Sequence, residues 1–182
     1  MEIPSLVRGA VSKLPLIGRG SSPTTDATAW RLRAAGDEAF EGALLEQSIV
    51  AIGTGEVGDL TEVPSPERLR AMLAKAMPER SASAVGTFAG YWSAFRSTIA
   101  PGDIVVVPLH GDQVAVGEVT GAYEYRKGQR DKRLRHVRPV RWLTTGLARA
   151  SLPDDLNRSI RAPGTLARIK VPDAATRLRA LS

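Results

Sequence analysis

The chain has 182 residues, of which 43% are hydrophobic, enough for one domain with a real core. It contains no cysteine, which excludes disulfides, zinc ribbons and thiol catalysis and suits a cytoplasmic protein. The formal net charge of +6 favours a polyanionic partner, most commonly nucleic acid, although charge alone fits a basic protein without such a partner equally well.

Changes in amino-acid composition along the chain predict three parts. Residues 1–26 form an N-terminal extension and linker, the latter rich in Gly, Ser, Thr and Pro. Residues 27–171 form the domain, and residues 172–182 a C-terminal helical tail. No apolar run reaches the ~18 residues that would cross a membrane, so no membrane partner is expected.

The domain is expected to begin with a strand, a helix and a second strand. Alternating polarity predicts the strand over residues 29–33. Asp37, Glu38 and Glu41 place negative charge in the first turns of a helix over residues 38–47. The short apolar run at residues 48–53 predicts the second strand.

Residues 53–58 formally match the GxGxxG pattern of dinucleotide-binding turns. That role needs a helix that begins within the turn, but Asp59, Pro64 and Pro66 follow here. The pattern therefore favours a glycine loop at the entrance of a ligand pocket and disfavours a nucleotide-binding site.

Two helices are expected next. Ser65 can cap a helix over residues 66–77, which Pro78 ends. A second helix over residues 81–99 carries an apolar face at three- and four-residue spacing, formed by Phe88, Tyr91, Trp92, Phe95 and Ile99. Phe95 is interpreted as a core residue.

Two β-branched runs separated by turn residues, at residues 104–108 and 114–121, predict antiparallel strands. Residues 123–125 and 137–143 are expected to continue the same barrel. A loop is expected over residues 144–153, a short helix over 154–161, a last strand over 165–171 and a terminal helix over 173–181. The expected fold class is α+β, a small and mostly antiparallel β-barrel with flanking helices.

Catalysis is not expected. His110 and His136 belong to no ligand-spaced cluster, and His136 is interpreted as a solvated strand residue. No serine lies in a GxSxG elbow. Asp154 and Asp155 could begin a nuclease motif, but Arg168 stands where the acidic-x-Lys half requires a carboxylate. We therefore expect no metal and no cofactor.

A cluster of basic residues follows Tyr125. Interpreted as a hairpin with its tip at residues 127–133, it can lie along nucleic-acid phosphates, and a solvated basic loop is the alternative. The expected phosphate-binding residues are Arg126, Lys127, Arg130, Lys132, Arg133, Arg135, Arg138 and Arg141. Aromatic residues flank this run, and aromatic faces stack on extruded bases.

The ordered series of motifs resembles a known family over residues 29–170. It comprises the Trp30 strand, Ile49 to Gly53, Tyr91 to Arg96, the strands from Pro101 to Gly121, and Arg135 to Trp142. The series resembles the EVE-like domain of the PUA superfamily, found at the N-terminus of Mrr-type modification-dependent restriction proteins.

The resemblance implies a PUA-like barrel and a pocket for a modified base flipped from nucleic acid. Such domains often carry a bulky aromatic where this chain has Thr54. The expected pocket residues are Trp30, Gly53, Thr54, Tyr91, Trp92, Glu118, Tyr123, Tyr125 and Trp142.

The leading hypothesis is a non-catalytic nucleic-acid reader in a prokaryotic defence setting, with DNA favoured over RNA. A separate nuclease or effector subunit is a second candidate partner. One alternative is an adaptor whose barrel binds a small ligand or partner peptide. Another is a nucleotide-dependent enzyme that uses residues 53–58.

Overall fold

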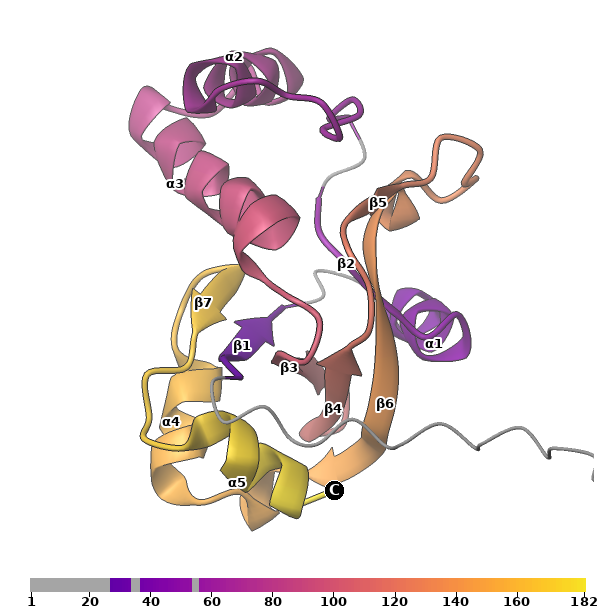
Figure 1. Ribbon diagram of the computed structural model, residues 1–182, viewed down its shortest axis with the longest axis vertical. Helices are drawn as coiled ribbons and strands as arrows, with labels where there is room; N and C mark the ends of the chain where they lie inside the picture. The colour runs from indigo at the N-terminus through magenta and orange to yellow at the C-terminus, as the bar shows by residue number, and fades with distance from the viewer. Residues whose placement is uncertain (1–26, 34–36, 54–55) are drawn as a thin grey trace, which may run out of the picture.

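A curled seven-stranded sheet organises the protein, and helices pack at both of its ends (Figure 1). The computed structural model describes residues 27–33, 37–53 and 56–182. The expected extension and linker at residues 1–26 lie outside this described part. The fold class is mixed α+β, as predicted.

The strands pair in the order β2-β6-β4-β3-β1-β7, and β5 also pairs with β6. Every pairing is antiparallel except the parallel one between β1 and β3. The strands are β1 (Ala29–Leu32), β2 (Ile49–Ala51), β3 (Ile104–Leu109), β4 (Gln113–Val119), β5 (Glu124–Tyr125), β6 (His136–Ala148) and β7 (Leu166–Arg168).

The long strand β6 joins the two halves of the sheet. Its first residues pair with β2 and β5, and from Val140 onwards it pairs with β4. The pairing reaches Ala148, opposite Gln113, so the loop expected from residue 144 is wrong at its start. Register shifts around Val116 increase the local twist and help to curl the sheet.

The sheet does not close into the expected barrel. Within the described residues, the end strands β2 and β7 do not pair, and each is only three residues long. Val50 of β2 and Leu166 of β7 instead belong to one apolar cluster with Trp92 and Phe95. These bulky side chains fill the space where closing strands would meet.

Side chains cap the first three helices, and of these caps the sequence predicted Ser65. Asp37 accepts a hydrogen bond from the Phe40 amide, Ser65 from the Arg68 amide and Ser81 from the Ala84 amide. The helices are α1 (Glu38–Glu46), α2 (Pro66–Ala76), α3 (Ala82–Ser93), α4 (Asp154–Arg161) and α5 (Ala174–Ala180), with the π-helix η1 (Ala94–Thr98) and the 3₁₀ turns η2 (Lys132–Leu134) and η3 (Arg149–Ser151). In the part of the chain that the structure describes, no helix is long and apolar enough to cross a bilayer.

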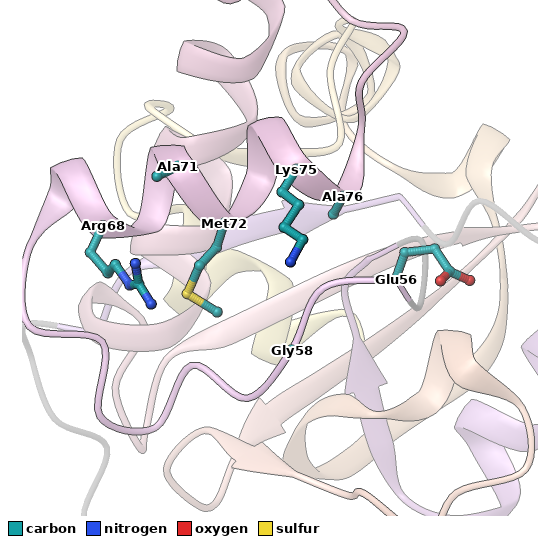
Figure 2. A pocket seen from close by; sticks show the side chains of 7 residues that line it. All are labelled: Glu56, Gly58, Arg68, Ala71, Met72, Lys75 and Ala76. Carbon is teal, nitrogen blue, oxygen red and sulfur yellow. The ribbon is translucent and has the colours of Figure 1, made fainter.

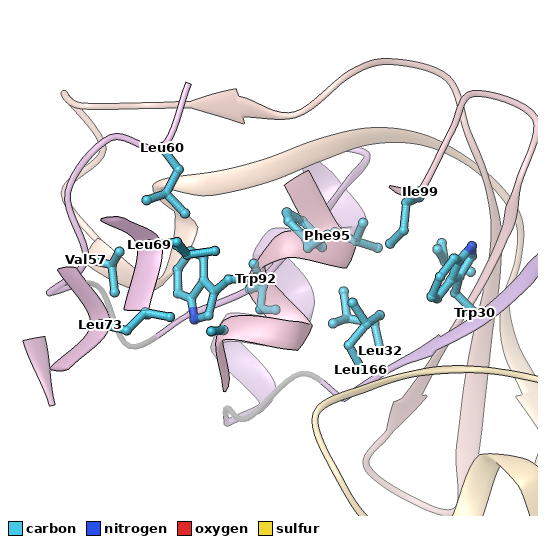
Figure 3. Close-up of a cluster of buried hydrophobic side chains, with 14 of the residues drawn as sticks. Trp30, Leu32, Val57, Leu60, Leu69, Leu73, Trp92, Phe95, Ile99 and Leu166 are labelled. Atoms are coloured by element: carbon cyan, nitrogen blue, oxygen red, sulfur yellow. The ribbon is translucent and has the colours of Figure 1, made fainter. Parts of the chain in front are cut away.

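Three apolar clusters hold these elements together. The largest joins α2 and α3 to the sheet, and Figure 3 shows Leu69 and Leu73 of α2 beside Trp92 of α3. A second cluster lies between the sheet and helices α4 and α5. A third, small cluster joins α1 to β2 and β6.

Candidate functional site

A small enclosed cavity lies at the end of β2, between α1 and α3. Its volume is about 220 Å³. This is below the ~300–1,000 Å³ of sites for drug-sized ligands, so the cavity suits a single ring system rather than a whole nucleotide. Its walls are largely apolar, and two arginines and a threonine supply polar groups. The lining residues are Arg33, Phe40, Ala51, Ile52, Gly53, Met77, Arg80, Phe88, Trp92 and Thr165.

The backbone of Gly53 lies directly against the ring of Trp92. Gly53 has φ +127°, and a Cβ atom there would stand 2.5 Å from Cη2 and 2.7 Å from Cζ2 of the indole. Only glycine fits both the conformation and the contact. Trp92 itself is 1% exposed, so its ring is packed as core at the cavity wall.

The buried side chain of His136 packs against Trp92. Its ring meets that of Trp92 edge-on, with centroids 4.6 Å apart. Nε2 lies 3.0 Å from the carbonyl oxygen of Val57, which can only accept, so Nε2 carries the proton and donates. Nδ1 then accepts from the hydroxyl of Tyr123 at 2.7 Å. The interpretation of His136 as a solvated residue is wrong, because its side chain is fully buried.

Burial sets the protonation state of this pair. Desolvation lowers the pKa of His136, because the buried imidazolium would lose its hydration, although the Val57 carbonyl and Asp59 partly oppose the shift. Desolvation likewise raises the pKa of Tyr123. Both groups are therefore neutral at pH 7. They hold Val57 against the sheet.

Of the expected pocket residues, Gly53 and Trp92 line the cavity and Thr54 lies outside the described residues. Tyr91 is next to the cavity, with its ring edge-on to Phe88 at 6.0 Å. Tyr123 and Tyr125 pack around His136 instead, at 6.0 and 4.9 Å between centroids.

The other three expected pocket residues have structural contacts elsewhere. The buried Trp30 donates its indole N–H to Asp103, 2.9 Å away. Trp142 packs over Gly117 and donates to the carbonyl of Leu44. Glu118 pairs with Arg141 and Arg179. None of the three lines the cavity.

Sequence reasoning missed Arg33, Phe40 and Arg80 as cavity residues. Arg33 donates to the carbonyl oxygens of Arg161 and Ala162, which fixes its guanidinium beside β7. The guanidinium of Arg80 lies 5.8 Å from the Phe88 ring centre. No local pattern marks these residues, because they come from three separate segments.

The basic hairpin between β5 and β6 adjoins this cavity. The guanidinium of Arg133 stacks over the ring of Phe40, a cavity wall, at 4.6 Å, and lies 3.5 Å from Asp37. Arg133 also pairs with Asp131, and this hydrogen-bonded pairing lowers the pKa of the Asp131 carboxyl. The hairpin is therefore joined to the cavity wall through the contact between Arg133 and Phe40.

The eight expected phosphate ligands differ in availability. Arg126, Lys132, Arg133 and Arg141 form ion pairs with side chains that are partly or largely exposed, and such pairs are weak and exchangeable. Within the described residues, Lys127, Arg130 and Arg135 form no ion pair.

The prediction that Arg138 binds phosphate does not agree with the structure. Its side chain is buried, and its guanidinium donates to the carbonyl oxygens of Phe95, Arg96 and Gly121. Burial lowers its pKa. Because the guanidinium N–H groups of Arg138 already donate to these carbonyl oxygens, the residue is not available to a phosphate.

Within the described residues 56–65, no helix follows the glycine pattern, as expected. Elsewhere, His110 pairs with Glu41 at 2.8 Å. The described residues contain no group of three metal-ligating side chains.

Comparisons with known proteins identify a family but no activity. No curated protein and no solved structure gives a significant match. One family model, described as a domain of unknown function (DUF8426), matches residues 30–162, which include the whole cavity wall except Thr165. Since this match spans most of the 182 residues, the chain belongs to the DUF8426 family.

Proposed function

We propose that the protein is a non-catalytic, PUA-like nucleic-acid reader that recognises a modified base in a prokaryotic defence setting. The curled, mostly antiparallel sheet with flanking helices supports the PUA-like assignment. The ordered motifs from Trp30 to Trp142 support its EVE-like character.

The observation that carries the proposal is the contact between Arg133 and Phe40. It joins a basic hairpin, suited to phosphates, to an aromatic-walled cavity of single-ring size. A strand held by the hairpin would have its bases close to the cavity. Arg33 and Arg80 at the cavity can donate hydrogen bonds to the polar edge of an inserted base.

The experiment compares matched oligonucleotides carrying methylated, hydroxymethylated, glucosylated or unmodified bases, single- and double-stranded, at two salt concentrations. We expect tighter binding to one modified form and weaker binding of all forms at high salt. Equal affinity for modified and unmodified forms under every condition would overturn the base-reading proposal.

Arg80→Gln tests the cavity within the same assay. We expect it to reduce the preference for the modified form about 5- to 150-fold, the effect of one lost charge-assisted hydrogen bond of ~1–3 kcal/mol. Arg158→Gln is the matched control, since Arg158 is exposed on α4 and does not line the cavity. Equal effects of both variants would place recognition outside the cavity.

One observation favours a second candidate, an adaptor that holds a small apolar ligand. Trp92 is covered by Gly53, so a base can stack on its face only if Gly53 moves, whereas a small ligand enters the existing space. A bound small molecule or partner that survives nuclease treatment, together with no oligonucleotide binding, would favour the adaptor.

A further inference from the structure

A groove of about 530 Å³ runs along α2, outside the site described above. It lies between α2 and the segment that begins at Glu56. Figure 2 shows Arg68 and Lys75 extending from α2 on either side of Met72, toward the segment that carries Gly58. Small apolar side chains, Ala71 and Ala76, complete the lining. An adjoining hollow shares Arg68 and Met72.

The two cations in this groove are spaced for a repeating anion. Arg68 and Lys75 are seven residues apart, which is about 10 Å along a helix axis and close to the same face. Two long cationic side chains at this separation on one helix face can contact separate phosphates of one nucleic-acid strand. Within the described part of the chain, neither cation forms an ion pair.

The acidic side chains near the groove either have a hydrogen-bonding or ion-pair partner or line the adjoining hollow. Glu56 pairs with Lys132 of the hairpin at 3.1 Å. Asp59 accepts hydrogen bonds from the amide and hydroxyl of Thr61. Glu62 lines only the adjoining hollow. The stretch between Arg68 and Lys75 therefore presents positive charge above an apolar floor.

The Glu56–Lys132 pair also connects the groove to the basic hairpin. Lys132 belongs to η2 at the hairpin tip, and Glu56 lines the groove. The hairpin thus contacts the base cavity through Arg133 and the α2 groove through Lys132. The α2 groove therefore adjoins the basic hairpin at this pair.

We propose that the α2 groove binds backbone phosphates of the same nucleic acid, with Arg68 and Lys75 as ligands and Met72 contacting the sugar faces. This proposal rests on the proposed nucleic-acid function. It adds a second contact surface, independent of the base cavity, that sets affinity and salt dependence without reading sequence.

The test measures the affinity of the full chain for an unmodified short duplex as a function of salt, from about 50 to 200 mM. Each phosphate contact contributes about 0.9 to the slope of log affinity against log salt. We expect Arg68→Gln with Lys75→Gln to reduce the magnitude of this slope by about 1.8. The control double variant, Arg158→Gln with Arg161→Gln, removes equal charge from exposed positions of α4 and should leave the slope unchanged.

Gly58→Glu provides a second variant that blocks the groove. A Cβ atom at Gly58 meets only the Cε atom of Met72, at an ordinary 3.8 Å, so the fold accommodates the change. The added carboxylate should repel phosphate and reduce duplex affinity at low salt by at least 10-fold, about the effect of one charge pair worth 1.4 kcal/mol.

The outcomes separate the two proposals. A reduced slope with no preference for any modified base supports the groove and overturns base reading. An unchanged slope in the double variant, with modified-base preference intact, overturns the groove alone. Absence of any oligonucleotide binding overturns both. Binding of an acidic peptide that requires Arg68 and Lys75, while duplex binding does not, would make the groove a protein-docking surface and also overturn the proposal.

Discussion

At the scale of single residues, His136 connects stability to pH. Its imidazole is buried between Trp92 and Tyr123, and its Nε2 proton is donated to the Val57 carbonyl. A charged ring at this position would lose its hydration and could no longer accept from Tyr123. The neutral form is therefore part of the folded structure.

The expected consequence is a loss of stability on mild acidification. Because the pKa of folded His136 is lowered from its usual value of about 6.5, the unfolded chain binds more protons below that pH. The free energy of unfolding should therefore fall as pH drops from about 6.5 toward the folded pKa, by up to about 1.4 kcal/mol per pH unit. Urea titrations at several pH values measure this.

His136→Gln should flatten that dependence, because the amide can still donate to Val57 and accept from Tyr123 but does not titrate. His110→Gln is the control, since the His110 side chain is 52% exposed. The carboxylates with lowered pKa, such as Asp131 and Asp155, lose their contribution only below about pH 4 and do not overlap this range. An unaltered slope in His136→Gln would contradict the assignment.

At the scale of elements, the end of α3 depends on a residue from β6. The helix continues into η1, where the Ile99 amide bonds to the Ala94 carbonyl, five residues back. The wide turn leaves the carbonyls of Phe95 and Arg96 free to accept from Arg138. A cation at a helix C-terminus also complements the helix dipole.

Arg138→Met should therefore destabilise the protein strongly. It removes the donors of three carbonyl oxygens in a buried setting, at about 1–3 kcal/mol each, so a loss of at least about 3 kcal/mol is expected. Arg141→Met, on the exposed part of the same strand, should cost no more than about 1 kcal/mol. Denaturant unfolding distinguishes them, and equal losses would contradict the structural role of Arg138.

At the scale of the whole molecule, α5 completes the second apolar cluster. Ala174, Ala175 and Leu178 are buried there with residues of β3, β4 and α4. Arg179 also donates to the Gly102 carbonyl at 2.6 Å, which joins the helix to the turn before β3. Residues 172–182 were expected as a tail, but α5 packs in the same core as the sheet.

Leu178→Ala is expected to cost about 2–5 kcal/mol, because it leaves a cavity in a fully buried site. Thr176→Ala on the exposed face of the same helix is the control and should change stability by less than about 0.5 kcal/mol. Thermal unfolding measures both. A loss below about 1 kcal/mol for Leu178→Ala would mean that α5 is dispensable for the core.

Local signals predicted most of the elements but not the candidate site. Ser65 caps α2 where the sequence indicated, and the valine-rich runs form strands. Helix capping and strand formation at these positions depend on residues only a few positions away in the sequence. The cavity depends instead on Arg33, Gly53 and Phe88 meeting from distant segments, which no local pattern records.

The sequence by itself determined the α+β composition, most element boundaries to within a few residues, and a segment rich in basic residues between β5 and β6. Only the tertiary structure decided which charges and rings are accessible. Arg138 and Arg141 are three residues apart on β6, but η1 supplies buried carbonyl acceptors to the first and solvent surrounds the second. Trp92 likewise becomes a cavity wall because Gly53 and His136 enclose it. Burial is set by contacts between segments far apart in the chain, and this is why composition and spacing could not predict it.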